Sequence, residues 1–107
     1  MNEPTLESLA DDADAAFSSV LPGFARTNRN VDSGWGARDG FRLVYEQGEK
    51  RCEVLYSDMA IEVTMNGKEL FGWAVHPDFA GNAFSRENLG KAISRIALSA
   101  LRSQHGA

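Results

Sequence analysis

The dipeptide Asn66-Gly67, which lies between two stretches typical of β-strands, restricts the fold of this chain more than any other feature. Asn-Gly favours a type I′ turn, because both central residues of that turn need a positive φ. The two stretches then pair as an antiparallel hairpin in which Val63 faces Leu70. A shift of one residue would move every side chain to the other face of the sheet.

This register gives the hairpin two different faces. The aliphatic face, which is the predicted floor for the helices, carries Ile61, Val63, Met65 and Leu70. The opposite face is acidic and aromatic, and it carries Glu62, Thr64, Glu69, Phe71 and Trp73. Exposed aromatics ringed by carboxylates would form a binding site. The alternative is that both aromatics lie under the loop of residues 34–40, or that a bulge at Gly72 returns one of them to the core.

Two further stretches upstream of the hairpin alternate between apolar and polar residues. Residues 41–46 and residues 51–57 both show the period of two that is typical of strands. Together with the hairpin they predict an antiparallel meander of three to four strands. Residues 24–31 are compatible with an edge strand, whereas residues 32–40 contain three glycines and are expected to form a loop.

Apolar residues recur at helical spacing at both ends of the chain. The N-terminal helix is predicted over residues 5–20, with Thr5 as its N-cap. The C-terminal helix is predicted over residues 86–103, with Ser85 as its N-cap. The apolar stripe of this second helix is expected to pack on the sheet, and it consists of Leu89, Ala92, Ile93, Ile96, Ala97, Ala100 and Leu101.

Leu98 stands about half a helical turn from that stripe, on the same side as Lys91 and Arg95. Single exposed leucines are common on protein surfaces. Leu98 is therefore either an ordinary surface residue or a small anchor for another chain.

The length of 107 residues fits one α+β domain, residues 1–107, in which an N-terminal helix, the meander and a C-terminal helix form two layers. Cys52 is the only cysteine, so no internal disulfide can form, and a reducing cytoplasm is the expected location. The acidic N-terminus lacks the basic region of a secretory signal. No apolar run is long enough for a membrane span.

The net charge of −4 argues against general binding of nucleic acids, which requires a basic surface. The charge is unevenly distributed, because residues 1–23 contain five acids and no basic residue. Three of these acids, Asp11, Asp12 and Asp14, are close together in the predicted helix. They either complement the helix dipole on a solvated surface or form an acidic patch for a basic partner.

No pattern in the chain predicts catalysis or metal binding. The two histidines, His76 and His105, are far apart, and there is no HxxxH, HExxH or Cys/His cluster. The glycines of residues 32–40 do not form a GxGxxG motif. Cys52 alternates with apolar residues in a predicted strand and is expected to be buried and inert. The chain is therefore expected to be non-enzymatic and to need neither cofactor nor metal.

The run FRLVYEQGEKRCEVLYSDMAIEVTMNGKELFG, followed by NLGKAISRIALSALR, resembles the small immunity proteins of bacterial polymorphic toxin systems, including those of contact-dependent growth inhibition. The resemblance in sequence extends from Phe41 to Arg102, and the predicted order of helix, meander and helix in the whole chain is also similar to that type of protein. It implies a cytoplasmic protein that binds and neutralises a cognate toxin domain, often a nuclease with a basic surface. An acidic inhibitor suits such a partner through electrostatic steering and complementarity.

Two surfaces compete as the predicted contact with the toxin domain. The preferred surface is the acidic and aromatic face of the hairpin, because binding energy concentrates at aromatics that are ringed by polar groups. The other surface consists of Asp11, Asp12 and Asp14. Two other functions remain open, namely a small ligand-binding or regulatory domain and a structural subunit of a larger assembly.

Overall fold

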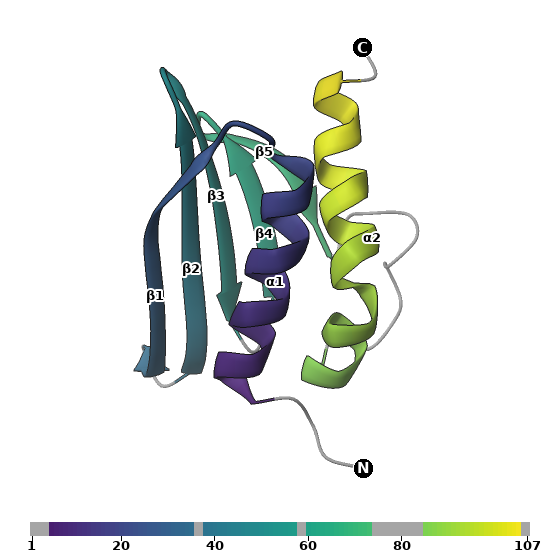
Figure 1. The fold of residues 1–107 in the computed structure, drawn as a ribbon. Coiled ribbons are helices and arrows are strands. Elements are labelled where there is room, and N and C mark those ends of the chain that lie inside the picture. The colour runs from purple at the N-terminus through teal and green to yellow at the C-terminus, as the bar shows by residue number, and fades with distance from the viewer. Residues whose placement is uncertain (1–4, 36–37, 58–59, 74–84, 106–107) are drawn as a thin grey trace.

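A computed structural model describes residues 5–35, 38–57, 60–73 and 85–105 of the chain (Figure 1). Two helices lie side by side on one face of a five-stranded antiparallel sheet, in which the strands follow the order of the sequence. The elements are α1 (Leu6–Val20), β1 (Ala25–Trp35), β2 (Arg38–Gln47), β3 (Lys50–Ser57), β4 (Ala60–Met65), β5 (Lys68–Gly72) and α2 (Arg86–His105). The predicted α+β class, with a helix at each end of a meander, is confirmed.

The described residues form five strands, so the prediction of three to four strands is wrong on this point. Strand β1 pairs with β2 from the Ala25–Glu46 pair to the Trp35–Arg38 pair, which places strands where the glycines predict a loop. Because β1 is an edge strand, it pairs with a single neighbour and carries mostly polar side chains. Its sequence therefore lacks the alternation that marks the inner strands.

Both helices begin at the predicted caps. The Ser8 amide donates a hydrogen bond to Thr5 Oγ1 at 3.1 Å, and the Asn88 amide donates one to Ser85 Oγ at 3.1 Å. Helix α2 ends at His105, slightly beyond its predicted end. The two helices run in the same direction, so their first turns lie at the same end of the molecule (Figure 1).

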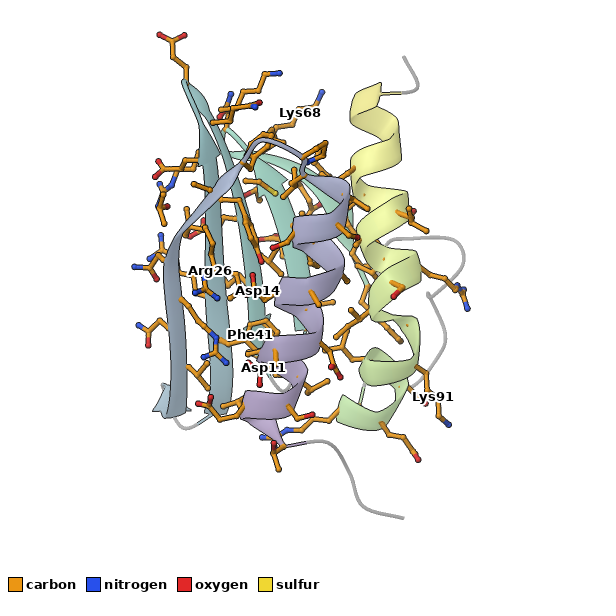
Figure 2. The ribbon with its side chains drawn as sticks, in the orientation of Figure 1. Asp11, Asp14, Arg26, Phe41, Lys68 and Lys91 are labelled. Atoms are coloured by element: carbon orange, nitrogen blue, oxygen red, sulfur yellow. The ribbon has the colours of Figure 1, made fainter. Side chains whose placement is uncertain are left out.

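One cluster of buried residues joins the two helices to strands β2 to β5. Phe41, whose ring stacks on Tyr56 with 4.9 Å between centroids, lies between the sheet and α1 (Figure 2). Every second side chain of β2, β3 and β4 contributes to the cluster: Phe41, Leu43, Tyr45, Cys52, Val54, Tyr56, Ile61 and Val63. Burial raises the pKa of the Cys52 thiol to about 11, so the thiol is protonated near neutral pH. The predicted burial of Cys52 is confirmed.

The hairpin has the predicted turn but not the predicted register. Both central residues of the turn have a positive φ, 51° and 83°. Thr64 pairs with Glu69, whereas the preceding Val63 pairs with Phe71. Leu70 is therefore the extra residue of a β-bulge, which bends β5 and shifts the pairing of all residues beyond it.

The bulge moves the two aromatics of the hairpin from the predicted surface into the core. Phe71 is 2% exposed and Trp73 is 7% exposed, and both belong to the buried cluster. The prediction that they share an exposed face with Glu62 and Glu69 is wrong. The turn determines only the register of the pairs next to it, and the alternative of a bulge is correct in kind, although the bulge lies at Leu70 and not at Gly72.

Candidate functional site

The face of the sheet opposite the helices is covered by neither helix (Figure 1). On this face, the register places Leu55 of β3 opposite Glu62 of β4, and Glu53 opposite Thr64. Glu69 of β5 also lies opposite Thr64, from the other side. Three carboxylates from three adjacent strands are therefore grouped beside one leucine. We call Glu53, Leu55, Glu62 and Glu69 the acidic sheet face.

In its protonated form, the Glu62 carboxyl group can donate a hydrogen bond to the Glu69 carboxylate. This hydrogen bond, partial desolvation and the negative charges of Glu69 and Glu53 raise the pKa of the Glu62 carboxyl above its ordinary value. Among the residues that the structure describes, neither Glu62 nor Glu69 has an ion-pair partner. The pair is therefore a local concentration of negative charge without a described cation.

An apolar surface adjoins this carboxyl pair. Leu55 is 38% exposed, and a hollow of about 370 Å³ beside it is lined by Leu55, Tyr56, Ser57, Ala60 and Glu62. On the other side of Leu55, the Arg42 guanidinium donates a hydrogen bond to the Glu53 carboxylate. The acidic sheet face thus combines an apolar centre with carboxylates, of which Glu53 alone is neutralised by a described cation.

The structure places the acids of the predicted hairpin site on the surface and its aromatics in the core. Glu62 and Glu69 lie together on the open face, as the hairpin predicts, whereas Phe71 and Trp73 are buried. The apolar residue of the surface is Leu55, which sequence reasoning does not single out. Its sequence signal is its place at an outward position of β3, among polar residues. Its proximity to Glu62 follows only from the pairing of β3 with β4.

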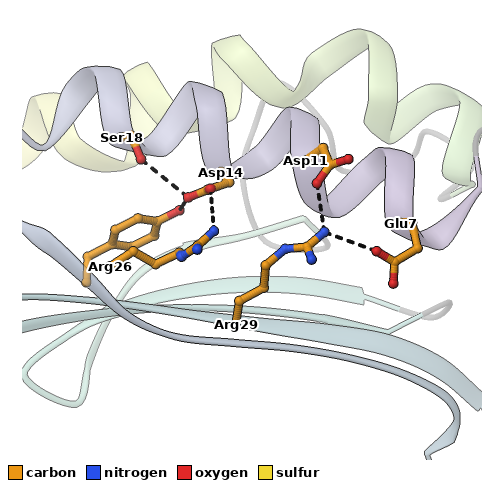
Figure 3. A network of polar contacts seen from close by, with 7 residues as sticks. Glu7, Asp11, Asp14, Ser18, Arg26 and Arg29 are labelled. Carbon is orange, nitrogen blue, oxygen red and sulfur yellow. Dashed lines mark hydrogen bonds and ion pairs between the residues drawn. The ribbon is translucent and has the colours of Figure 1, made fainter.

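The acids of α1, the other predicted site, mostly bind arginines of β1 (Figure 3). Arg26 Nη1 donates to Asp14 Oδ2 at 2.6 Å. Arg29 Nη2 donates to Asp11 Oδ1 at 2.7 Å and to Glu7 Oε1 at 3.3 Å. These contacts connect the edge strand to the first helix.

Asp14 has a further role inside the fold. Its Oδ1 atom accepts a hydrogen bond at 2.6 Å from the hydroxyl of the buried Tyr45 and one at 3.3 Å from Ser18. Asp12, in contrast, is exposed and has no ion-pair partner among the described residues. The three acids therefore do not form one patch, since Asp11 and Asp14 bind β1 and Asp12 faces solvent.

Asp14→Ala is expected to lower the free energy of unfolding by about 1–3 kcal/mol, because it removes the acceptor of the Tyr45 hydroxyl and of the Arg26 guanidinium. Asp12→Ala, at an exposed position two residues away, is expected to change the free energy of unfolding of the monomer by less than about 0.5 kcal/mol. Urea unfolding near neutral pH measures both values. Equal effects of the two substitutions would contradict the internal role of Asp14.

The carboxyl pair predicts a pH dependence of stability. A carboxyl pKa that is raised in the folded state makes a contribution to the stability of the fold. This contribution is fully present below the ordinary pKa of 4.5 and is lost as the pH rises through the raised pKa. Glu62→Gln is therefore expected to melt at a higher temperature than wild type near neutral pH, and to lose this small advantage in acid. Thermal unfolding over a pH series measures the difference in melting temperature between the variant and wild type. A difference that does not vary with pH would contradict this prediction.

Among the described residues, no group of three or more His, Cys, Asp and Glu side chains is arranged to hold a metal ion. Neither described helix is long and apolar enough to cross a membrane. No family model, curated protein or solved structure matches the chain. Its function is therefore inferred from its own surfaces.

Proposed function

We propose that this chain is a small inhibitor of the immunity type, which binds the basic surface of a cognate toxin domain in the cytoplasm and has no catalytic activity of its own. The observation that supports this most is the Glu62–Glu69 carboxyl pair, which lacks a described cation. Two carboxyl groups in one site interact unfavourably when both are ionised. A cationic side chain of a partner, placed between them, would relieve this cost.

The acidic sheet face has the composition of a small binding centre. Leu55 and the hollow beside it offer an apolar contact from which a partner can exclude water, and the carboxylates supply a polar rim. A long basic side chain fits this arrangement, since its aliphatic stem can pack on Leu55 while its charged end reaches Glu62 and Glu69. Arginine suits it best, because its planar guanidinium binds carboxylates with two parallel hydrogen bonds.

The net charge of −4 adds a long-range contribution to the same interaction. An acidic inhibitor is steered towards a basic partner, which raises the association rate at low ionic strength. Binding is therefore expected to weaken as salt is added, because exposed charges are screened.

A second function, the binding of a small ligand, is favoured by the hollow beside Leu55. Its volume of about 370 Å³ is near the lower end of the range for ligand sites, about 300–1,000 Å³. A ligand bound there would raise the melting temperature of the isolated chain. A screen of anionic, neutral and cationic metabolites without any such shift would leave the protein partner as the better explanation.

The proposal is tested with the product of the gene that adjoins the gene for this chain. That gene is expected to encode a large effector with a basic C-terminal domain, and the purified domain is expected to bind this chain with a dissociation constant of about 1 nM or lower. Cells that produce the domain are expected to grow only when they also produce this chain. A toxic domain that fails to bind at micromolar concentration would contradict the proposal.

A further inference from the structure

Each helix carries a row of four exposed residues on the side turned away from the sheet. The row on α1 consists of Ser8, Asp12, Ala15 and Ser19. The row on α2 consists of Glu87, Lys91, Ser94 and Leu98. Both rows have the spacing i, i+4, i+7 and i+11, which keeps their side chains on one side of the helix. We call the two rows together the helix surface.

The two rows border a groove between the helices. Its lining includes Asp12, Ala15 and Ser19 from α1 and Gly90 and Ser94 from α2, around a volume of about 390 Å³. A hollow of about 100 Å³ continues the groove to the last residue of the α2 row. The helix surface is therefore concave along its middle and carries mostly small side chains there.

The rows match each other along the groove, because the helices run in the same direction (Figure 1). Asp12 and Gly90 line the groove together, and Ser19 and Leu98 line its continuation together. The groove is lined by residues 12–19 of α1 and 90–94 of α2, and its continuation by residues 16–20 and 94–98. Asp12 and Lys91 therefore lie near one end of the groove, and Ser19 and Leu98 lie near its other end. The acid Asp12 on the α1 row and the base Lys91 on the α2 row thus lie at similar positions along the helix direction.

Three residues of the helix surface present groups that can bind another molecule. Leu98 is 49% exposed, the highest value among the large apolar side chains of the described residues. Asp12 and Lys91 have no ion-pair partner in the described part of the chain. Lys91 points away from the body of the molecule (Figure 2).

We propose that the helix surface binds a second copy of this chain about a two-fold axis parallel to the helices. A rotation about such an axis does not change the position of any residue along the direction of the helices. It places the α1 row of each copy against the α2 row of the other copy. Asp12 then faces Lys91 of the partner subunit, and Ser19 faces Leu98 of the partner subunit. Each contact occurs twice, so the dimer has two ion pairs and two leucine contacts.

The charges of the helix surface favour a second copy over an unrelated partner, because the surface is complementary to itself. Its acid and its base lie at similar positions along the helix direction on different rows, which is the arrangement that this two-fold axis pairs. Ala15 and Ser94, between the charged and the apolar contact, are small enough to let the helices of two copies approach closely. The acidic sheet face lies on the other side of the molecule, so the dimer is independent of the proposed function and leaves both copies of that face free.

Sedimentation equilibrium of the full chain is expected to give twice the chain mass of 11.7 kDa. Leu98→Glu is expected to raise the dimer dissociation constant at least about 30-fold without changing the melt of the monomer, because Leu98 is exposed. Leu55→Glu, the same change on the opposite face, is the control that keeps the dimer. A wild-type chain that stays monomeric at about 1 mM, or a Leu98→Glu variant that dimerises like wild type, would overturn the proposal.

A mixing experiment tests the orientation of the two copies. Asp12→Lys brings lysines together across the two-fold axis, and Lys91→Glu brings acids together, so each variant alone is expected to be at least about 10-fold weaker as a dimer. A mixture of the two variants restores both ion pairs and is expected to form heterodimers with nearly wild-type affinity. Failure of the mixture to associate better than either variant alone would overturn the proposed axis.

Discussion

Phe71→Ala is expected to lower the free energy of unfolding by about 3–5 kcal/mol. This is a large part of the total free energy of unfolding of a typical domain, which is about 5–15 kcal/mol. Phe71 is 2% exposed and belongs to the buried cluster between the sheet and the helices. Loss of its ring leaves a cavity that the surrounding side chains fill only in part. Urea unfolding measures the effect as a shift of the midpoint at constant m-value.

Leu70→Ala is the matched control for this substitution. Leu70 is the bulge residue and is only partly buried, so its truncation is expected to cost about 1 kcal/mol. In a hairpin without the bulge, Leu70 would point into the core and Phe71 would point outwards. A larger loss of stability for Leu70→Ala than for Phe71→Ala would therefore contradict the observed register.

The strongly periodic parts of the fold were predictable from the sequence. Both helices carry continuous apolar stripes and begin at a capping Ser or Thr, which places their ends close to the predicted ones. The turn of the hairpin was predictable as well, because few residue pairs adopt two positive φ angles as readily as Asn-Gly. These elements together imply an antiparallel meander between two helices.

The bulge at Leu70 was not predictable from local pattern. The sequence KELFG is too short to distinguish a strand with Leu70 inward from one with Phe71 inward. Tertiary packing favours the second arrangement, since Phe71 and Trp73 together bury more apolar surface in the core than Leu70 alone. Strand β1 was difficult for a related reason. Among its described side chains, residues 25–31, only Val31 packs against the core, and its polar sequence resembles a loop.

The candidate site was predictable only in its acidic half. Glu62 and Glu69 follow from the hairpin itself, whereas the exposed Leu55 joins them through the pairing of β3 with β4. The separation of Asp11 and Asp14 from Asp12 also needs the tertiary structure, because their arginine partners are on β1. A single sequence shows which residues are acidic but not which of them are already neutralised.

Glu62→Lys is expected to weaken binding of the basic partner at least about 100-fold. The new lysine repels the partner's cation and also forms an ion pair with Glu69, so the site loses both of its free carboxylates. The fold is expected to keep its stability, because Glu62 is exposed and its interaction with Glu69 changes from repulsion to attraction. Glu49→Lys is the matched control, since Glu49 is exposed at the turn between β2 and β3, outside the acidic sheet face.

The most direct test of the acidic sheet face is the affinity of the purified basic domain for wild type, Glu62→Lys and Glu49→Lys, measured by calorimetry at low and high salt. All three proteins are expected to melt at similar temperatures. The predicted result is a loss of affinity, relative to wild type, of at least about 100-fold for Glu62→Lys and of no more than about threefold for Glu49→Lys. The difference in affinity between the two variants is expected to be smaller at high salt. A folded Glu62→Lys variant that binds the domain as tightly as Glu49→Lys would contradict the proposed site.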